Sequence, residues 1–177
     1  MYKTTSGIFK RVLVAIDFGE PSTRAVDVAV ALASTFEAEL LVMHAYWFPP
    51  VAYSGFTDGI AWQATDLMEQ DAKTFDAALA GVRARHPRTE GVLLTGEPSA
   101  MILQAAKEGG ADVIVLGTHG RRGLSRVFLG SVAEKVVRLS PVPVLTIPGH
   151  ADAAAKSRAQ SDVAAPLEPR RAQSPKG

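Results

Sequence analysis

The chain has 177 residues, enough for one α/β domain with a buried core and too few for two ordinary ones. Its formal net charge of +1 argues against general binding to nucleic acid or to an anionic membrane, and no run of about 18 apolar residues predicts a membrane helix. The absence of cysteine excludes disulfides, thiolate metal sites and cysteine nucleophiles, and it is consistent with the cytoplasmic location that we expect.

In chain order, apolar strand patterns alternate with helical ones. The first half predicts a strand over residues 12–16, a helix from Pro21 to about Phe36, a strand over 40–44 and a helix from about Trp62 to Arg85. The second half predicts a strand over 91–95, a helix from Pro98 to Gly109–Gly110, a strand over 113–116, a helix from Gly130–Ser131 and a strand over 142–147. Most of these strands are continuously apolar, which is typical of a parallel sheet buried on both faces.

This alternation, joined by right-handed crossovers, predicts a doubly wound open α/β sheet with helices on both faces. We expect one domain over residues 1–148. Residues 149–177 contain no aromatic residue and only Val163 and Leu167 as sizeable aliphatics, so we expect a disordered tail. Residues 46–60 are rich in Pro, Gly and aromatics and predict a long loop, whose rings either cover a ligand or cover the edge of the core.

Two strand ends carry residues suited to binding phosphate. Asp17 follows the first strand, and the fourth is followed by Gly117, His119 and Gly120 and later by Gly130-Ser131 at a helix start. Glycines permit close approach of an anion and positive φ angles, and a helix N-terminus offers unsatisfied N–H groups. The alternative is that the glycines only end a strand and make turns and that Ser131 is only an N-cap.

The spacing Gly117-x2-Gly120-x9-Gly130-Ser131 resembles the Gly-x2-Gly-x9-Gly-Ser motif of the ATP-binding universal stress proteins. The opening RVLVAIDFGEPSTRAVDVAVALA and the closing SPVPVLTIP are also similar to that family, so the resemblance covers about residues 9 to 148. It implies a Rossmann-like fold of five parallel strands in the order 3-2-1-4-5, with an adenine nucleotide held between the first and fourth strands.

The resemblance also assigns the binding residues. Ala15, Ile16 and Asp17 would line the adenosine side, with Asp17 on the ribose hydroxyls or assisting a metal ion, and Ala45 would lie against adenine. Leu116, Gly117, His119 and Gly120 would contact ribose and the first phosphates. Gly130, Ser131 and Val132 would receive the outer phosphates. Neighbouring His44 is expected to be a half-buried strand residue with its hydrogen bonds satisfied, the alternative being a ligand contact.

Several motifs of efficient catalysis are missing. The sequence has no Gly-x4-Gly-Lys-Ser/Thr loop, no Gly-x-Gly-x-x-Gly turn and no Gly-x-Ser-x-Gly elbow, and its four histidines have no metal-binding spacing. We therefore assign no catalytic residue and no dedicated metal site. We expect a stress-response or signalling module that binds ATP with Mg²⁺. Two alternatives remain: a slow ATPase or self-phosphorylating protein using the same pocket, and a nucleotide-free interaction protein.

The last strand, residues 141–147, would be an exposed apolar edge in a monomer. Such an edge is an aggregation hazard that symmetric pairing removes, so we expect a homodimer joined through this strand, as the resemblance also implies.

Overall fold

A computed structural model of the chain describes residues 8–47, 58–118 and 129–148, with the side chains of residues 58–65 left undescribed. The predictions made for His119, for Gly120, for most of the long loop and for the tail from 149 to 177 lie outside these residues.

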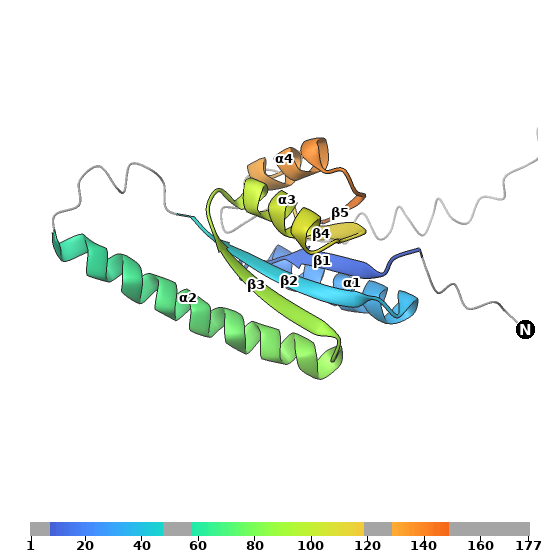
Figure 1. The fold of residues 1–177 in the computed structure, drawn as a ribbon, viewed down its shortest axis with the longest axis horizontal. Coiled ribbons are helices and arrows are strands. Elements are labelled where there is room, and N and C mark those ends of the chain that lie inside the picture. Colours follow the sequence, from blue (N-terminus) through green and yellow to red (C-terminus); the bar gives the residue numbers. More distant parts are fainter. Residues whose placement is uncertain (1–7, 48–57, 119–128, 149–177) are drawn as a thin grey trace, which may run out of the picture.

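The described strands form a single parallel sheet in the order β3-β2-β1-β4-β5, as expected. The order reverses at β1, because β2 and β3 follow on one side of it and β4 and β5 on the other (Figure 1). The strands are β1 (Arg11–Ala15), β2 (Glu39–Tyr46), β3 (Thr89–Thr95), β4 (Val113–Gly117) and β5 (Val144–Ile147).

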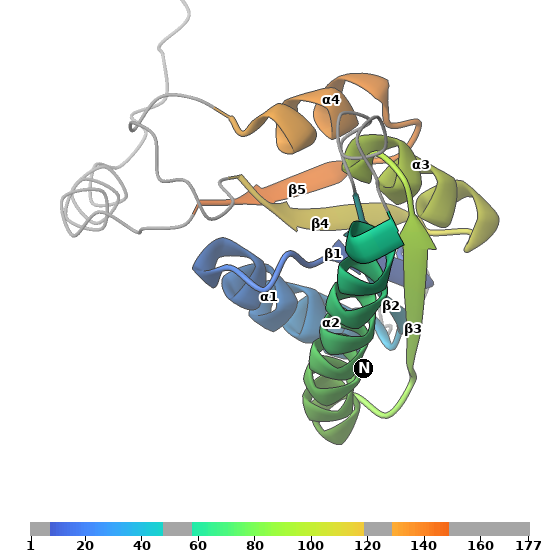
Figure 2. The same cartoon turned by 90° about the vertical axis from the view of Figure 1, so that its left-hand side faces the viewer.

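Helices connect consecutive strands and cover both faces of the sheet. They are α1 (Glu20–Phe36), α2 (Asp58–Arg85), α3 (Pro98–Glu108) and α4 (Ser131–Leu139). Figure 2 shows α1 and α2 on one side of the sheet and α3 and α4 on the other. A proline lies in the first turn of both α1 and α3, where its missing N–H has no intrahelical role. Gly110, with φ of 63°, turns the chain after α3, a conformation that glycine adopts without steric cost.

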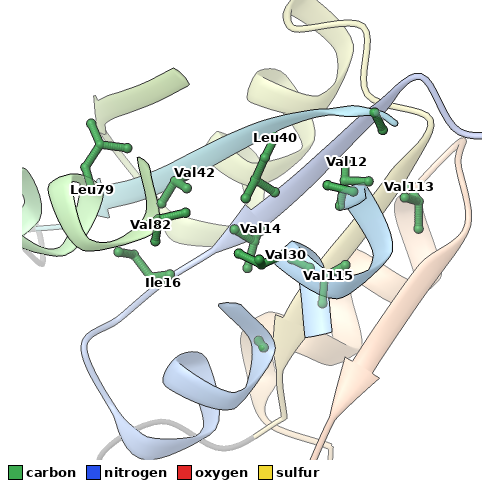
Figure 3. Packing of buried hydrophobic residues seen from close by; sticks show 14 of the residues in the cluster. Val12, Val14, Ile16, Val30, Leu40, Val42, Leu79, Val82, Val113 and Val115 are labelled. Atoms are coloured by element: carbon green, nitrogen blue, oxygen red, sulfur yellow. The ribbon is translucent and has the colours of Figure 1, made fainter. Parts of the chain in front are cut away.

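The two faces of the sheet hold separate cores, because alternate side chains of each strand point in opposite directions. Val12 and Val14 pack with the alanines of α1 and with Leu79 and Val82 of α2 (Figure 3). Leu13 packs instead with residues of α3 and α4. All three of these β1 side chains are fully buried, which explains why the strand reads as a continuous apolar run rather than an alternating one.

Some element ends differ from the prediction. β5 begins at Val144 rather than at residue 142, because Ser140 Oγ exchanges hydrogen bonds with both the N–H and the carbonyl of Val142 and holds it in a turn. β3 begins at Thr89 rather than at Gly91, since an edge strand can pair through its backbone while bearing polar side chains. α2 begins at Asp58, before Trp62, so the connection after β2 is shorter than predicted.

Within the part of the chain that the structure describes, no helix is both long and apolar enough to cross a membrane.

Candidate functional site

A cavity of about 960 Å³ opens at the carboxyl ends of the strands, around the point where the strand order reverses. Its volume lies within the range of roughly 300–1,000 Å³ that is usual for small-molecule sites. In open α/β sheets this edge is where ligands bind, because the two flanking connections leave in opposite directions and open a crevice.

Every site residue predicted from the sequence that the structure describes lines this cavity: Ala15, Ile16, Asp17, Ala45, Leu116, Gly117, Gly130, Ser131 and Val132. The fold thus brings together the ends of β1, β2 and β4 with the start of α4. His119 and Gly120 lie outside the described residues.

The turn after β1 presents Asp17 to solvent at the cavity. Its Oδ1 accepts a hydrogen bond of 3.0 Å from the N–H of Gly19, a two-residue side-chain turn that fixes the carboxylate next to the start of α1. Phe18, between them, has a φ of 60°, which a bulky residue rarely adopts. Strained residues of this kind are concentrated at functional sites, where the surrounding structure holds them.

Gly117 lies at the end of β4 and faces the start of α1. A Cβ atom added to it would lie 2.7 Å from Cβ and 2.9 Å from the carbonyl carbon of Pro21. Its φ is not positive. Close packing between strand and helix is therefore sufficient to require glycine here.

The start of α4 forms another wall of the cavity. Gly130 is the N-cap, with φ of −56°, so positive φ is not needed there either. Its N–H donates to the carbonyl of Thr118 at 2.6 Å, which removes it from the amides open to a ligand. Ser131 is the first helical residue and is exposed, so the alternative that Ser131 is the N-cap is wrong. The amides of Ser131, Val132 and Ala133 belong to the first turn, where a helix provides no acceptors.

His44 also lines the cavity, on the strand next to β1. Its Nδ1 lies 2.8 Å from the carbonyl oxygen of Ile16, so the half-buried position is confirmed and one of the two ring nitrogens is hydrogen-bonded among the described residues. The ring packs between Phe18, at 4.6 Å between ring centroids, and Tyr46, at 5.4 Å.

Helices α2 and α3 contribute lining residues that the sequence reasoning did not assign to the site: Leu67, Asp71, Pro98 and Ile102. Leu67 has the helical spacing of a core residue, yet it is 55% exposed. The N-terminal part of α2 extends past the ends of β2 and β3, so no sheet lies beneath it (Figure 1). Trp47, at 50% exposure, stands at the same rim and comes from the aromatic segment after β2.

The described lining carries the carboxylates of Asp17 and Asp71 and no Lys or Arg side chain. Burial, and then the charges of Asp71 and Asp76, raises the pKa of Tyr46, whose hydroxyl donates to the carbonyl of Met68 at 3.1 Å. No group of three or more metal-ligating side chains occurs among the described residues. The described lining can therefore attract an anion through the start of helix α4, and any cation that pairs with that anion must come from outside the described lining.

Glu97 caps α3 beside the cavity. Burial acts to raise its pKa, but hydrogen bonds from the Ser99 hydroxyl and the Ala100 N–H, together with the charge of Lys135, hold that pKa below its usual value. The Lys135 ammonium lies 3.4 Å from the Glu97 carboxylate and so links α4 to the start of α3.

The sequence profile of the Universal stress protein family matches residues 8–148. Universal stress protein YxiE of Bacillus subtilis (strain 168) is 34% identical over 148 residues, which cover 79% of this chain and 99% of that protein. A universal stress protein of Thermus aquaticus is 39% identical over 143 residues, with 79% and 99% covered.

Solved structures share the fold. UspA from Lactobacillus plantarum superposes with a TM-score of 0.67 at 24% identity, over 78% of this chain and 97% of that one. A universal stress protein solved in complex with cAMP superposes with a TM-score of 0.57 at 25% identity, over 80% and 98%.

Proposed function

The chain belongs to the universal stress protein family, and from that premise we propose that it binds ATP, with Mg²⁺, in the cavity at the carboxyl edge of its sheet. In this proposal it acts as a stress-response or signalling module whose state depends on the bound nucleotide.

One observation carries the proposal. The sequence assigned binding residues in four separate segments of the chain. All of those that the structure describes line one cavity of suitable size. The relative solved with cAMP supports an adenine nucleotide as the ligand class. The family match ends at residue 148, which supports treating residues 149–177 as separate from the domain.

The cavity lining combines three kinds of chemistry. Small and apolar side chains, among them Ala15, Ala45 and Ile102, suit a flat base. The first turn of α4 suits phosphate, because its free amides and helix dipole attract an anion. Asp17 suits the ribose hydroxyls or Mg²⁺, an ion that proteins commonly hold with one or two carboxylates plus the phosphates of the ligand.

The same site admits a slow ATPase or a self-phosphorylating protein as a second function. The exposed hydroxyl of Ser131, in the first turn of α4, is the described group that favours it. Incubation of the protein with Mg-ATP for several hours separates the two: the binding module leaves ATP intact, whereas the alternative yields ADP or phosphoserine. A nucleotide-free interaction protein would bind neither ATP nor another adenine nucleotide.

The replacement Gly130→Val tests the site. Its backbone angles are open to any residue, so the added side chain acts mainly by occupying space beside the first turn of α4. We expect Mg-ATP to bind at least about tenfold more weakly by isothermal titration calorimetry. Gly81→Val is the matched control, because a Cβ at Gly81 has no atom within 4 Å. Equal affinities in Gly130→Val and wild type would remove this site.

We also propose a homodimer joined through β5. The other edge strand, β3, bears the polar residues Thr89, Glu90 and Thr95, whereas Leu145 of β5 is an apolar residue 39% exposed. Leu139, at the end of the adjacent α4, is exposed as well. Analytical ultracentrifugation should give a dimer for wild type and for Ile8→Lys, an exposed apolar control, and a monomer for Leu145→Lys. A wild-type monomer at micromolar concentration would contradict the proposal.

A further inference from the structure

The cavity has two sides, because strand β2 directs alternate side chains to opposite faces of the sheet. Val42 packs in the core beneath α1 and α2, whereas Met43 packs in the core beneath α3 and α4. Ala15, Ala45 and Leu116, which the sequence assigned to the nucleotide, belong with Met43. The other side, which we call the α2 side, is lined by Phe18, His44, Tyr46, Leu67 and Asp71.

Aromatic rings line the α2 side and contact one another. The His44 ring lies between Phe18, at 4.6 Å, and Tyr46, at 5.4 Å between ring centroids. The Tyr46 hydroxyl reaches α2, where it donates to the carbonyl of Met68 at 3.1 Å. Asp71 follows Met68 by three residues and so lies on the same face of the helix. The carboxylate of Asp71 and the hydroxyl end of Tyr46 are therefore neighbours at the cavity.

The Asp71 carboxylate has no partner in the described part of the chain. It is half-buried, and no hydrogen bond or ion pair to a described residue engages it. Lys73, on the same helix, is paired with Glu69 at 2.7 Å. Burial, and then the charges of Asp71 and Asp76, raises the pKa of Tyr46, so the electrostatic potential here is negative. Withdrawing a carboxylate from water is costly unless a cation pairs with it, so a ligand on this side should bring positive charge.

We propose that the α2 side binds a small organic cation, an amine or a guanidine, whose charge pairs with Asp71 and whose carbon body lies against Tyr46 and Leu67. Aromatic rings suit this ligand class, because their π electrons attract cations. Leu67, at 55% exposure, offers an apolar surface that is still open. A metal ion fits less well, since hard metal ions need several oxygen ligands and the described residues contain no group of three metal-ligating side chains. This site is additional to the proposed nucleotide site and does not depend on it.

Butylguanidine is a suitable probe, because it joins a guanidinium group to a short carbon chain, and butylurea is its neutral counterpart. NMR titrations of the full chain without nucleotide measure both affinities. We expect butylguanidine to bind at least about tenfold more tightly than butylurea, the effect of a hydrogen bond to a charged group. Asp71→Asn should abolish this preference. Asp66→Asn is the matched control, because Asp66 is an exposed acidic residue of the same helix outside the described lining, and it should keep the preference.

The methyl signals in the same spectra locate the probe. Butylguanidine should shift those of Leu67 and leave unchanged those of Ile102, which lies on the α3 and α4 side. Thermal unfolding checks that Asp71→Asn is folded. Equal affinities for the two probes in wild type, which would also result if a basic side chain of this chain already paired with Asp71, overturn the inference. So does an unchanged preference in Asp71→Asn, or a shift at Ile102 in place of Leu67. Titration with Mg-ATP is a separate measurement, so failure of one proposal is distinguishable from failure of the other.

Discussion

The replacement Gly117→Ala distinguishes a glycine needed for packing from one needed for a ligand. In the structure the new Cβ would lie 2.7 Å from Cβ and 2.9 Å from the carbonyl carbon of Pro21, closer than carbon atoms approach without displacement. Pro21 lies in the first turn of α1, so relief of the clash requires the helix to move away from β4. Overpacking of this kind lowers the free energy of unfolding by about 1–3 kcal/mol. Alanine also reduces the conformational entropy of the unfolded chain, which offsets roughly 0.5–1 kcal/mol of that loss.

We therefore expect Gly117→Ala to lower the free energy of unfolding by about 1–2 kcal/mol in the absence of nucleotide. For a domain of this size the melting temperature should fall by roughly 2–8 °C. Gly81→Ala is the matched control. Gly81 lies inside α2 with free space around it, so the same substitution should stabilise the protein by about 0.5–1 kcal/mol. Urea and thermal unfolding of the three proteins measure both effects. If Gly117→Ala unfolds like wild type and fails only in binding ATP, the packing argument is wrong.

Further predictions concern a residue beside the cavity, Glu97, and one that lines it, Tyr46. Glu97→Ala should lose about 1 kcal/mol of stability at neutral pH, because it removes the side chain that caps α3. Folding lowers the pKa of Glu97, so the stability that its carboxylate contributes is present above the pKa of the unfolded chain and is lost as the pH falls through the pKa of the folded protein. Urea unfolding in acid should therefore show the difference in stability between wild type and Glu97→Ala becoming smaller. Tyr46→Phe should cost about 0.5–1.5 kcal/mol through the lost hydrogen bond to Met68. Folding raises the pKa of Tyr46, so its contribution to stability is fully present below the pKa of the unfolded chain and is lost as the pH rises through the folded value. In alkaline solution Tyr46→Phe should therefore lose less free energy of unfolding than wild type. Equal losses in the two proteins would contradict this assignment.

The parts of the fold that were predictable are those where burial determines residue type. β1, β2 and β4 are buried on both faces over most of their length, so aliphatic residues predominate in them and their positions follow from the sequence. The edge strands were harder. β3 begins with Thr89, whose buried hydroxyl donates to the His86 carbonyl, and with the exposed Glu90, and β5 is shortened by the turn at Ser140 and Val142. An apolar pattern reveals neither.

The candidate site was predictable where strand ends and turns carry distinctive residues, as at Asp17 and Gly117. Helix residues gave no comparable signal. Leu67 has the spacing of a core residue, and only the position of α2 beyond the sheet makes it a cavity wall. The hydrogen bond of the His44 ring goes to a carbonyl 28 residues away along the chain, and the requirement for glycine at Gly117 depends on Pro21. Both are tertiary contacts without a local pattern.

Binding of a nucleotide is tested most directly by mass spectrometry of the small molecules released from natively purified protein, followed by titration of the emptied protein with Mg-ATP. We expect ATP, or another adenine nucleotide, to co-purify in an amount close to one per chain and the emptied protein to bind Mg-ATP again. Recovery of no nucleotide, together with no detectable binding in the titration, would contradict the proposed function.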